Sequence, residues 1–461
     1  MKIALINISI RPDAKKKILP VGLGFIATAM KNAEIKFDII DMDINNYTVE
    51  DVEKIIEKEH YDVFLFGCIV SGFKYAKELS ESIRKVTPQA TIIAGNSFAD
   101  AIPDLALRKT EVDICVLGEG DDTVPELLKA LNSGSSLHEV KGIVFLEEGQ
   151  LVKTPPRPYR DSMDSYGFPD WDLFELEKYK EYFHMASLFS KDKEICSFPL
   201  NSARGCPHSC TFCYIVVRNK KIRYRRYSEE AIYNEILRLH EKYGANHIDF
   251  WDDYSFPNKT KLIERLETIE RLPFKIKWSG IIRTGLLKKD DKDIIRRAAE
   301  SGCTCLAFSL ESASEEILKA INKNIEVDDF LEQCHVLYDN GIPPATSIIL
   351  GYPQETLETM KKTIDVCKKS RVYPSVGFLL PLPGTEVYQW CKDSKKISSD
   401  FDFLMNIGDR QDFHINLTSI PDDIFLESAE KGFRELAEEF GLELESVFKT
   451  TTYQETKNIQ K

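Results

Sequence analysis

Residues 197–213 read SFPLNSARGCPHSCTFC, a strand pattern that runs directly into three cysteines, Cys206, Cys210 and Cys213. The spacing C-x3-C-x2-C makes a loop short enough to wrap three corners of a metal–sulfur cube. Thiolates are the preferred ligands of iron–sulfur clusters, and three thiolates rather than four leave one iron open to bind another molecule. An open coordination position implies chemistry, so this loop is our first candidate for an active site.

Two alternatives to a cluster apply to these cysteines. Structural zinc needs a fourth ligand and usually two C-x2-4-C pairs, whereas this loop contains only His208 besides the thiols and no second pair follows. Cysteine is also a small core residue, but a triplet this compact favours metal binding. We expect the remaining cysteines in the core: Cys68, Cys115, Cys196, Cys303, Cys305, Cys334, Cys367 and Cys391.

Length and composition limit the class of protein. The chain has 461 residues, more than one core usually supports, which predicts two or three domains. Its 43% hydrophobic residues are typical of a globular protein, and its net charge of -13 argues against nucleic acid as a partner. No window reaches the roughly 18 apolar residues of a membrane span, and no signal-peptide cleavage site follows the first residues. We therefore expect a cytoplasmic protein with no membrane span.

Strand and helix patterns alternate on both sides of the cysteine loop. Residues 196–390 contain six strand patterns in series, which predict a partial (β/α)6 barrel with its site at the carboxyl ends of the strands. Residues 1–145 contain five, which predict a doubly wound, Rossmann-like parallel sheet of the α/β class. Residues 146–195 are rich in Pro and aromatic side chains and are expected to form a linker, and residues 391–461 a mostly helical extension.

The cysteine triplet, with an aromatic residue at Phe212, resembles the signature of the radical S-adenosylmethionine (SAM) superfamily. The resemblance implies a 4Fe-4S cluster on Cys206, Cys210 and Cys213, with SAM bound to the open iron. It also implies that one-electron reduction cleaves SAM to a 5′-deoxyadenosyl radical. The reductant would be a protein such as flavodoxin or ferredoxin.

Further residues match that family's SAM-binding positions. By resemblance, Asp252 and Asp253, in IDFWDDYSF, would bind the amino group of SAM, and Glu311, in LAFSLESAS, would contact the ribose hydroxyls. Arg283 and the stretch SIILGYPQET complete the set, although Gln354 replaces a usual Gly. Taken singly, an Asp or Glu at a strand end is often a helix cap. The sequence therefore implies Phe212, Asp252, Asp253, Arg283 and Glu311 as SAM-binding residues.

The first 145 residues resemble the cobalamin (B12)-binding domain that precedes the barrel in many of these enzymes. Glycines at a sheet edge let the backbone approach a large planar ligand closely. The alternative is a domain that keeps the fold and binds a substrate or partner instead. The D-x-H-x-x-G motif that supplies an axial His elsewhere is absent, and Asn96 stands at a usual Gly. The cobalamin-binding residues implied by the resemblance are Leu23, Gly24, Ser71, Gly95, Asn96, Gly118, Glu119 and Gly120.

Together these features lead to one hypothesis and several alternatives. The hypothesis is a cobalamin-dependent radical SAM methyltransferase that methylates an unactivated carbon or phosphorus centre of a small-molecule or peptide substrate. The first alternative keeps the cluster and the radical but transfers no methyl group: a cyclase, a rearrangement or an oxidative enzyme. A methylthiotransferase is disfavoured because its N-terminal domain carries three cluster cysteines, whereas residues 1–150 contain only Cys68 and Cys115. A non-catalytic sensor would not need the ordered acidic residues. No catalytic acid, base or quenching residue is identified.

Overall fold

The computed structural model divides the chain into two compact units, which we describe separately. The sheet unit comprises Met1–Ala186 and Ile397–Ile407, and the cysteine unit comprises Ser187–Lys396 and Gly408–Lys461. The structure describes residues 1–12, 14, 16–160, 162–183, 194–215 and 224–442. The end of the predicted helical extension and part of the predicted linker lie outside these ranges.

A seven-stranded sheet in the order β2-β1-β3-β4-β5-β6-β7 forms the core of the sheet unit. Its first five strands are parallel, as the sequence predicts, while β6 and β7 add an antiparallel hairpin that the sequence analysis missed. The first four residues of β1 are each no more than 2% exposed, because helices cover both faces. The strands are β1 Ile3–Asn7, β2 Asp38–Asp41, β3 Val63–Gly67, β4 Thr91–Gly95, β5 Ile114–Val116, β6 Ile143–Glu147 and β7 Gln150–Lys153.

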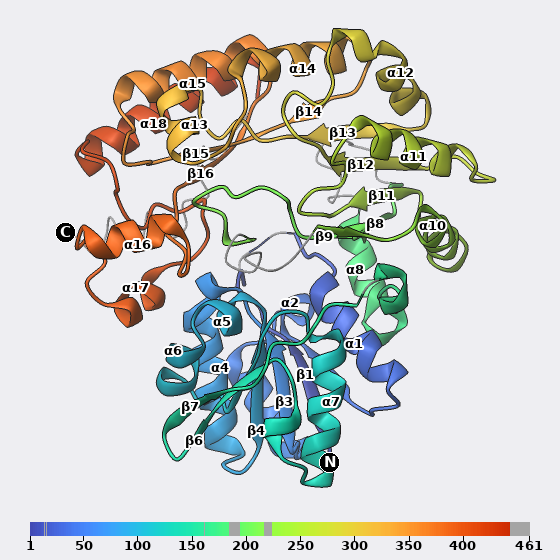
Figure 1. Ribbon diagram of the computed structural model, residues 1–461, viewed down its shortest axis with the longest axis vertical. Helices are drawn as coiled ribbons and strands as arrows, with labels where there is room; N and C mark the ends of the chain where they lie inside the picture. Colours follow the sequence, from blue (N-terminus) through green and yellow to red (C-terminus); the bar gives the residue numbers. More distant parts are fainter. Residues whose placement is uncertain (13, 15, 161, 184–193, 216–223, 443–461) are drawn as a thin grey trace. The chain divides into compact units, whose positions relative to one another are not determined.

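Helices of the sheet unit pack in pairs on the sheet (Figure 1). Helix α1 lies beside α7, and α3 beside α4, which is the doubly wound arrangement. Thr48 begins α3 with a capping box, in which its hydroxyl accepts from the backbone of Asp51 and the Asp51 carboxylate accepts in return. The helices are α1 Val21–Asn32, α2 Met42–Asn45, α3 Val49–Glu59, α4 Phe73–Val86, α5 Asn96–Ala101, α6 Pro103–Lys109, α7 Gly120–Ser133, α8 Leu176–Phe183 and α17 Asp400–Asn406.

The cysteine unit contains six parallel strand positions in series. Five strands pair in the order β14-β13-β12-β11-β8, and β15 pairs with β16. A parallel bridge between Glu311 and Ile348 connects the two sets. The strand predicted over residues 344–351 is split into β14 and β15. The strands are β8 Ser197–Leu200, β11 His247–Phe250, β12 Lys277–Ile281, β13 Cys303–Ala307, β14 Pro344–Ala345, β15 Ser347–Leu350 and β16 Ser375–Phe378.

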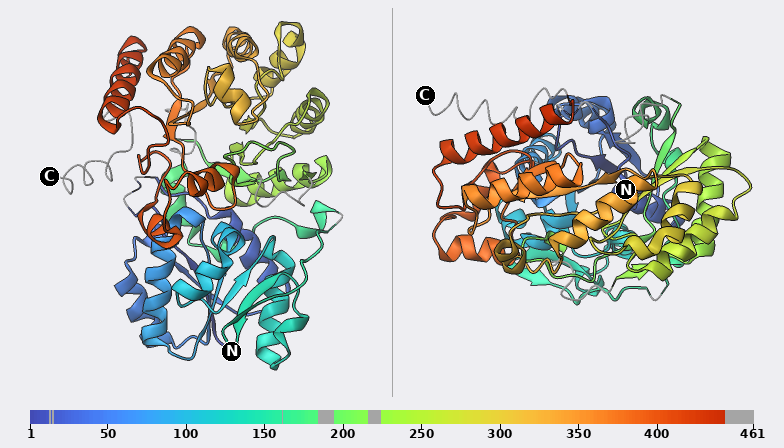
Figure 2. Two further views of the ribbon diagram at one scale, coloured as in Figure 1. Left: turned by 60° about the vertical axis from the view of Figure 1, so that its left-hand side comes forward. Right: turned by 90° about the horizontal axis from the view of Figure 1, so that it is seen from above.

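Most helices of this unit follow one another in an arc on one side of the strands (Figure 2). They are α10 Glu229–Tyr243, α11 Lys259–Glu270, α12 Lys292–Glu300, α13 Glu315–Ala320, α14 Val327–Asp339, α15 Leu357–Ser370, α16 Glu386–Asp393 and α18 Asp422–Glu439. This arrangement matches the predicted curled sheet with helices outside it. No helix among the described residues combines the length and hydropathy needed to cross a membrane.

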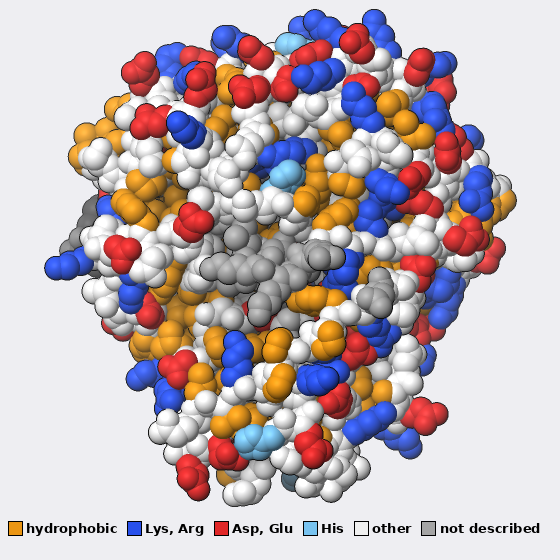
Figure 3. Space-filling view, in the orientation of Figure 1, with side chains coloured by type: hydrophobic (Ala, Val, Ile, Leu, Met, Phe, Trp, Pro, Cys, Tyr) orange, Lys and Arg blue, Asp and Glu red, His pale blue; other side chains and the backbone are white. Residues whose placement is uncertain are grey.

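Aromatic side chains fill the layer between strands and helices of the cysteine unit. Trp278, fully buried, meets Phe250 and Phe256 edge-on at centroid distances of 6.2 and 5.9 Å. Gly280 makes room for this cluster, since a Cβ there would lie 2.7 Å from the Phe256 ring. These packed rings hold the strand ends on a rigid apolar layer. On the surface, basic and acidic side chains are interspersed over the face drawn in Figure 3.

Two glycines with positive φ test how tightly the strands are packed. At Gly302 (φ +98°) a Cβ would lie 2.3 Å from the carbonyl oxygen of Ile276, whereas at Gly341 (φ +77°) nothing lies within 4 Å. Gly341→Ala should cost about 1 kcal/mol for the left-handed backbone alone, and Gly302→Ala at least about 2 kcal/mol more because the backbone must move. Urea unfolding of both variants measures the difference. Equal costs would contradict the packing described.

Candidate active site

The three cysteines lie on a loop that follows the short strand β9 (Ala203–Arg204). Cys210 is buried and Cys206 and Cys213 are half-buried; the amide of Cys213 donates to the carbonyl of Cys210 at 3.1 Å. Burial raises the pKa of the thiols, that of Cys213 to about 11, so ligation to a metal would have to remove their protons. In the described part of the chain no three His, Cys, Asp or Glu side chains converge on one metal position. A cubane does not require that convergence, because each thiolate binds a different iron.

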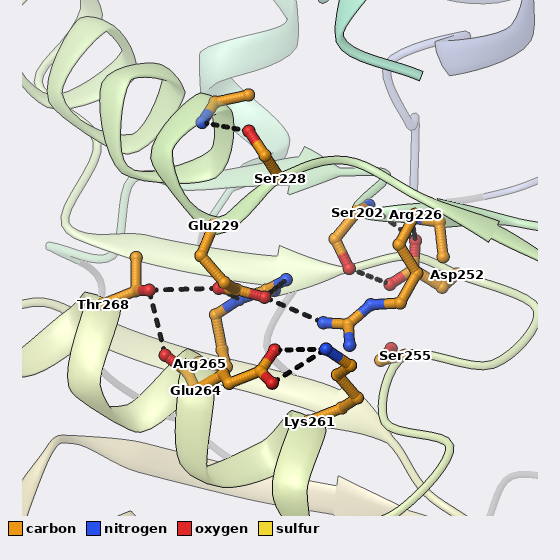
Figure 4. Close-up of polar contacts among 12 residues, drawn as sticks. Ser202, Arg226, Ser228, Glu229, Asp252, Ser255, Lys261, Glu264, Arg265 and Thr268 are labelled. Atoms are coloured by element: carbon orange, nitrogen blue, oxygen red, sulfur yellow. Dashed lines mark hydrogen bonds and ion pairs between the residues drawn. The ribbon is translucent and has the colours of Figure 1, made fainter. Parts of the chain in front are cut away.

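Asp252 fixes the chain immediately before the cysteine loop (Figure 4). Its Oδ1 accepts from the amides of Ser202 and Ala203 at 2.7 and 2.9 Å, and its Oδ2 accepts from the Ser202 hydroxyl at 2.7 Å. The residue is 3% exposed, and burial raises its pKa to about 6 despite these hydrogen bonds. Both oxygens of the carboxylate predicted to bind SAM therefore already accept hydrogen bonds from Ser202 and Ala203 of the protein itself.

Asp253, the next residue, is placed differently. Its side chain is exposed, and its negative charge contributes to the raised pKa values of Cys206 and Cys213. A carboxylate that acts on both thiols lies beside the loop and remains accessible. Of the two predicted carboxylates, Asp253 is thus the one suited to an ammonium group.

A second network fixes the strand that pairs with β9. Strand β10 (Arg225–Arg226) is antiparallel to β9, and Nη2 of Arg226 lies 2.8 Å from Oε1 of Glu229. The fully buried guanidinium of Arg265 donates to both carboxylate oxygens of Glu229, at 2.7 and 3.1 Å, and lies over the Phe250 ring (Figure 4). These ion pairs tie the β9–β10 ribbon to α11. No sequence pattern indicated these ion pairs, since charged residues on helices are usually solvated.

A turn at residues 321–324 contacts the cysteine loop from another element. The amide of Thr211 donates to the carbonyl of Ile321 at 3.1 Å. Nδ2 of Asn322 donates to the carbonyl and to the hydroxyl of Ser209, at 3.1 and 2.8 Å. Asn322 has φ +53°, a left-handed conformation that Asn tolerates better than most residues. The sequence analysis missed this turn.

Arg283 and Lys323 bring positive charge to the same place. The guanidinium of Arg283 donates to the carbonyls of Lys323 and, at 3.2 Å, Asn324, so it secures the turn. Both cations oppose the burial that raises the pKa of Cys210. Burial, reinforced by these two cations, lowers the pKa of His208 to about 4, which keeps that imidazole neutral at pH 7. Predicted as a SAM-binding residue, Arg283 here supports the loop that holds the thiols.

Glu311 lies in a buried ion pair with Lys323. The two charged atoms, Oε1 and Nζ, are 2.8 Å apart and both side chains are nearly inaccessible. Glu311 has φ +62° and takes part in the bridge to β15. Its second oxygen, Oε2, is buried with no hydrogen-bond partner among the described residues. A buried acceptor of this kind fits a hydroxyl group of a ligand, as the predicted ribose contact requires.

Phe212 meets the stretch GYPQET, which follows β15. Its ring lies edge-on to Tyr352 at 6.3 Å, and the Tyr352 hydroxyl is buried without a partner in the part of the chain that the structure describes. Glu355 holds the turn, because its Oε2 accepts from the amide of Gly351 at 2.9 Å. Burial raises the pKa of Glu355 to about 7. The turn forms with Gln354 at the position of the usual Gly.

The carboxyl edge of the parallel sheet carries the predicted cobalamin residues. Gly67 pairs with Gly95 where β3 and β4 end, and a Cβ at either would meet nothing closer than 3.9 Å. Two open glycines side by side make a flat backbone surface, which fits a planar corrin. Gly67 was not among the predicted residues, although it ends a strand pattern as Gly95 does.

The other predicted cobalamin residues differ in their surroundings. Ser71 lies in a 3-10 turn, η1 (Val70–Gly72), and Asn96 begins α5 with φ +65°. The amide of Gly118 donates to Asp100 at 2.6 Å. A Cβ at Gly24 would lie 3.0 Å from Pro169 and Trp171, so Gly24 serves the packing of α1 on the linker. The remaining predicted residues are Leu23, on α1, Glu119, which precedes α7, and Gly120, its first residue.

Replacing each of the two neighbouring aspartates separates their roles. Asp252→Ala leaves two buried backbone amides unpaired, at about 1 to 3 kcal/mol each, and should lower the iron bound after anaerobic reconstitution. Asp253→Ala removes an exposed carboxylate, so it should keep the iron and weaken SAM binding. Iron analysis and equilibrium dialysis with SAM measure both. An Asp252→Ala protein that keeps its full iron content but loses its affinity for SAM would show that Asp252 itself binds SAM.

Asn322→Gly tests the turn without disturbing its backbone, because Gly adopts the left-handed conformation readily. The variant loses the two hydrogen bonds to Ser209, about 1 kcal/mol each, and the one that Asn322 accepts from Asn324 within the turn. Release of iron to a chelator should therefore be several-fold faster. The matched control is Asn46→Gly in the sheet unit, which also has positive φ (51°) and ends α2. Equal release rates in Asn322→Gly and the wild type would show that the amide does not hold the loop.

Family models match most of both units. The radical SAM superfamily model matches residues 200–367, and the B12 binding domain model matches residues 10–128. An uncharacterised methyltransferase of Pyrococcus horikoshii is 28% identical over 80% of this chain and 78% of its own length. Cytidylyl-2-hydroxyethylphosphonate methyltransferase of Streptomyces wedmorensis is 25% identical over 85% and 81%. The anaerobic magnesium-protoporphyrin IX monomethyl ester cyclase of Cereibacter sphaeroides is 24% identical, and the match spans 82% of this chain but only 61% of the cyclase.

Two solved structures share the fold at 16% identity. The radical SAM methyltransferase TsrM from Kitasatospora setae matches 85% of this chain and 76% of its own with a TM-score of 0.66. The cobalamin-dependent SAM radical enzyme OxsB matches 96% and 62% with a TM-score of 0.67. These matches confirm the predicted architecture of a parallel-sheet domain followed by a radical SAM domain. The chain therefore carries a radical SAM domain over residues 200–367, preceded by a B12-binding domain over residues 10–128.

Proposed function

We propose that this protein is a cobalamin-dependent radical SAM methyltransferase, which methylates an unactivated carbon or phosphorus centre of a small-molecule or peptide substrate. The observation that carries the proposal is the presence of both domains in one chain whose relatives include several named methyltransferases. Hopanoid C-3 methylase of Methylococcus capsulatus, 23% identical over 83% of this chain, is a further relative of this kind.

The cysteine unit would hold the cluster and SAM. Cys206, Cys210 and Cys213 would ligate three irons of a 4Fe-4S cluster, which supplies the electron that cleaves SAM. Asp253 supports binding of the SAM ammonium group through its accessible charge. Glu311 supports a ribose contact through its unpartnered oxygen, while Lys323 fixes the other oxygen at 2.8 Å.

Other residues of this unit would position the cysteine loop and enclose the cofactor. Asp252 would position the cysteine loop rather than touch SAM, because its oxygens accept from Ser202 and Ala203. The Phe212 ring and the buried Tyr352 would exclude water from the cofactor. We assign Arg283 to the turn at residues 321–324, with its charge available to an anionic group of a ligand.

The sheet unit would bind cobalamin along the carboxyl edge of its sheet. The bound cobalamin would supply a carrier for the methyl group. The open Gly67–Gly95 pair would face the corrin, with Ser71 and Asn96 on the segments that follow β3 and β4. Electrons must come from outside the chain, and a flavodoxin or ferredoxin would provide them one at a time.

One specific observation favours a second function. Anaerobic magnesium-protoporphyrin IX monomethyl ester cyclases from three organisms are 23 to 25% identical to this chain. A cyclase would use the same cluster and the same SAM site without transferring a methyl group. The two functions differ in what SAM becomes, so product analysis separates them.

Products of SAM formed with dithionite as reductant test the proposal even without the substrate. The reconstituted protein should form 5′-deoxyadenosine whether or not cobalamin is present, and S-adenosylhomocysteine only when cobalamin is present. The triple variant Cys206→Ala, Cys210→Ala, Cys213→Ala should lose 5′-deoxyadenosine. Cys303→Ala, which alters a buried thiol outside the loop, should lose neither product. No S-adenosylhomocysteine from the cobalamin-loaded wild type would favour the cyclase-like alternative.

A further inference from the structure

A segment from the C-terminal part of the chain belongs to the sheet unit. The chain leaves the cysteine unit after Lys396, adds Ile397–Ile407 to the sheet unit, and returns at Gly408. Ile397, Leu404 and Ile407 of this segment are 4%, 0% and 6% exposed. Its helix α17 lies against α4, beside the blue helices of the unit in Figure 1. The segment is therefore packed into the unit and is not a loose connection.

Phe401 of α17 completes a row of aromatic rings. Its ring meets Phe73, the first residue of α4, edge-on at 5.9 Å and 88°, and Nζ of Lys109 lies over it at 5.9 Å. Phe73 in turn lies 5.7 Å from Phe98 of α5, and Phe98 lies 6.3 Å from Phe66 of β3. The row runs from α17 through two helices to the sheet.

The row touches the two segments that follow β3 and β4. Phe73 lies two residues after Ser71, and Phe98 two residues after Asn96, both predicted cobalamin-binding positions. The segments are also joined to each other, because the amide of Val70 donates to the Ser97 hydroxyl at 2.8 Å. Their fit is close: a Cβ at Gly72 would lie 2.5 Å from Sγ of Cys68. A shift of Phe73 or Phe98 would therefore move the residues at the sheet edge.

We propose that α17 is part of the cobalamin site, with Phe401 as a positioning residue for η1 and α5. This inference rests on the proposed function, since it concerns how the same corrin is held. Phe401 touches no ligand in this role. It fixes Phe73, and through Phe73 and Phe98 it presents Ser71 and Asn96 in one arrangement before cobalamin binds. Such preorganisation raises affinity by reducing the ordering cost of binding.

The test measures binding of hydroxocobalamin to the full-length protein by absorbance, without SAM or reductant. Phe401→Ala should raise the Kd about tenfold, equivalent to about 1.4 kcal/mol, while iron content and SAM affinity stay as in the wild type. Phe401→Leu keeps an apolar side chain and should recover most of the affinity. In the apo protein, amide hydrogen exchange in residues 68–98 should be faster in Phe401→Ala.

Phe425→Ala is the matched control for general destabilisation. Phe425 is a buried ring on α18 of the cysteine unit, 6.0 Å from Phe378 and 5.7 Å from Phe413. This variant should lose stability but keep the wild-type Kd for cobalamin. An unchanged Kd in Phe401→Ala, or an equal loss in Phe425→Ala, overturns the role of α17 and leaves the proposed function in place. A wild-type protein that binds no cobalamin overturns the proposed function itself.

Discussion

The buried carboxylate of Asp252 is the contact on which the arrangement of the thiols depends. It accepts three hydrogen bonds from Ser202 and Ala203, which follow β8, and Cys206 comes three residues after Ala203. An ionised carboxylate in this position is costly unless its oxygens are paired, and here they are. Because Asp252 lies two residues after β11 and Ser202 lies two residues after β8, the parallel pairing of these two strands brings the carboxylate to the start of the loop.

Two other elements hold the loop from independent directions. The Glu229–Arg265 ion pair anchors the β9–β10 ribbon, and the turn at residues 321–324 contacts Ser209 and Thr211. That turn also carries Lys323, the partner of Glu311. The predicted SAM-binding carboxylate and the predicted cluster loop are therefore connected through a few residues of backbone. A displacement of Glu311 would therefore be transmitted to the cysteine loop through these contacts. This coupling suits a site that must hold a cluster and SAM in a fixed relative position.

Sequence reasoning recovered what is encoded locally. The strand patterns of both units and the buried Cys303 and Cys305 followed from periodicity and spacing. The β6–β7 hairpin was missed because its sequence lies among charged residues that indicate a surface loop. The Asn322 turn and the packing of α17 on the sheet unit were missed for another reason. Their roles come from contacts with residues more than a hundred positions away, such as Ser209 and Phe73, which no local pattern reveals. Asp252 shows the limit of a motif, which identifies a position but not what its oxygens contact.

The backbone of Glu311 has a consequence for how this site can change over time. A residue other than Gly with φ +62° carries about 1 to 2 kcal/mol of conformational strain. Glycine at this position would relieve the strain, but it would leave the ammonium group of Lys323 buried without its partner carboxylate, which costs more than the strain that is relieved. Selection for stability therefore keeps a carboxylate here in spite of the strained backbone, and the second oxygen of the same side chain is then present for a ligand. Glu311 marks a place in this fold where stability and ligand binding require the same side chain.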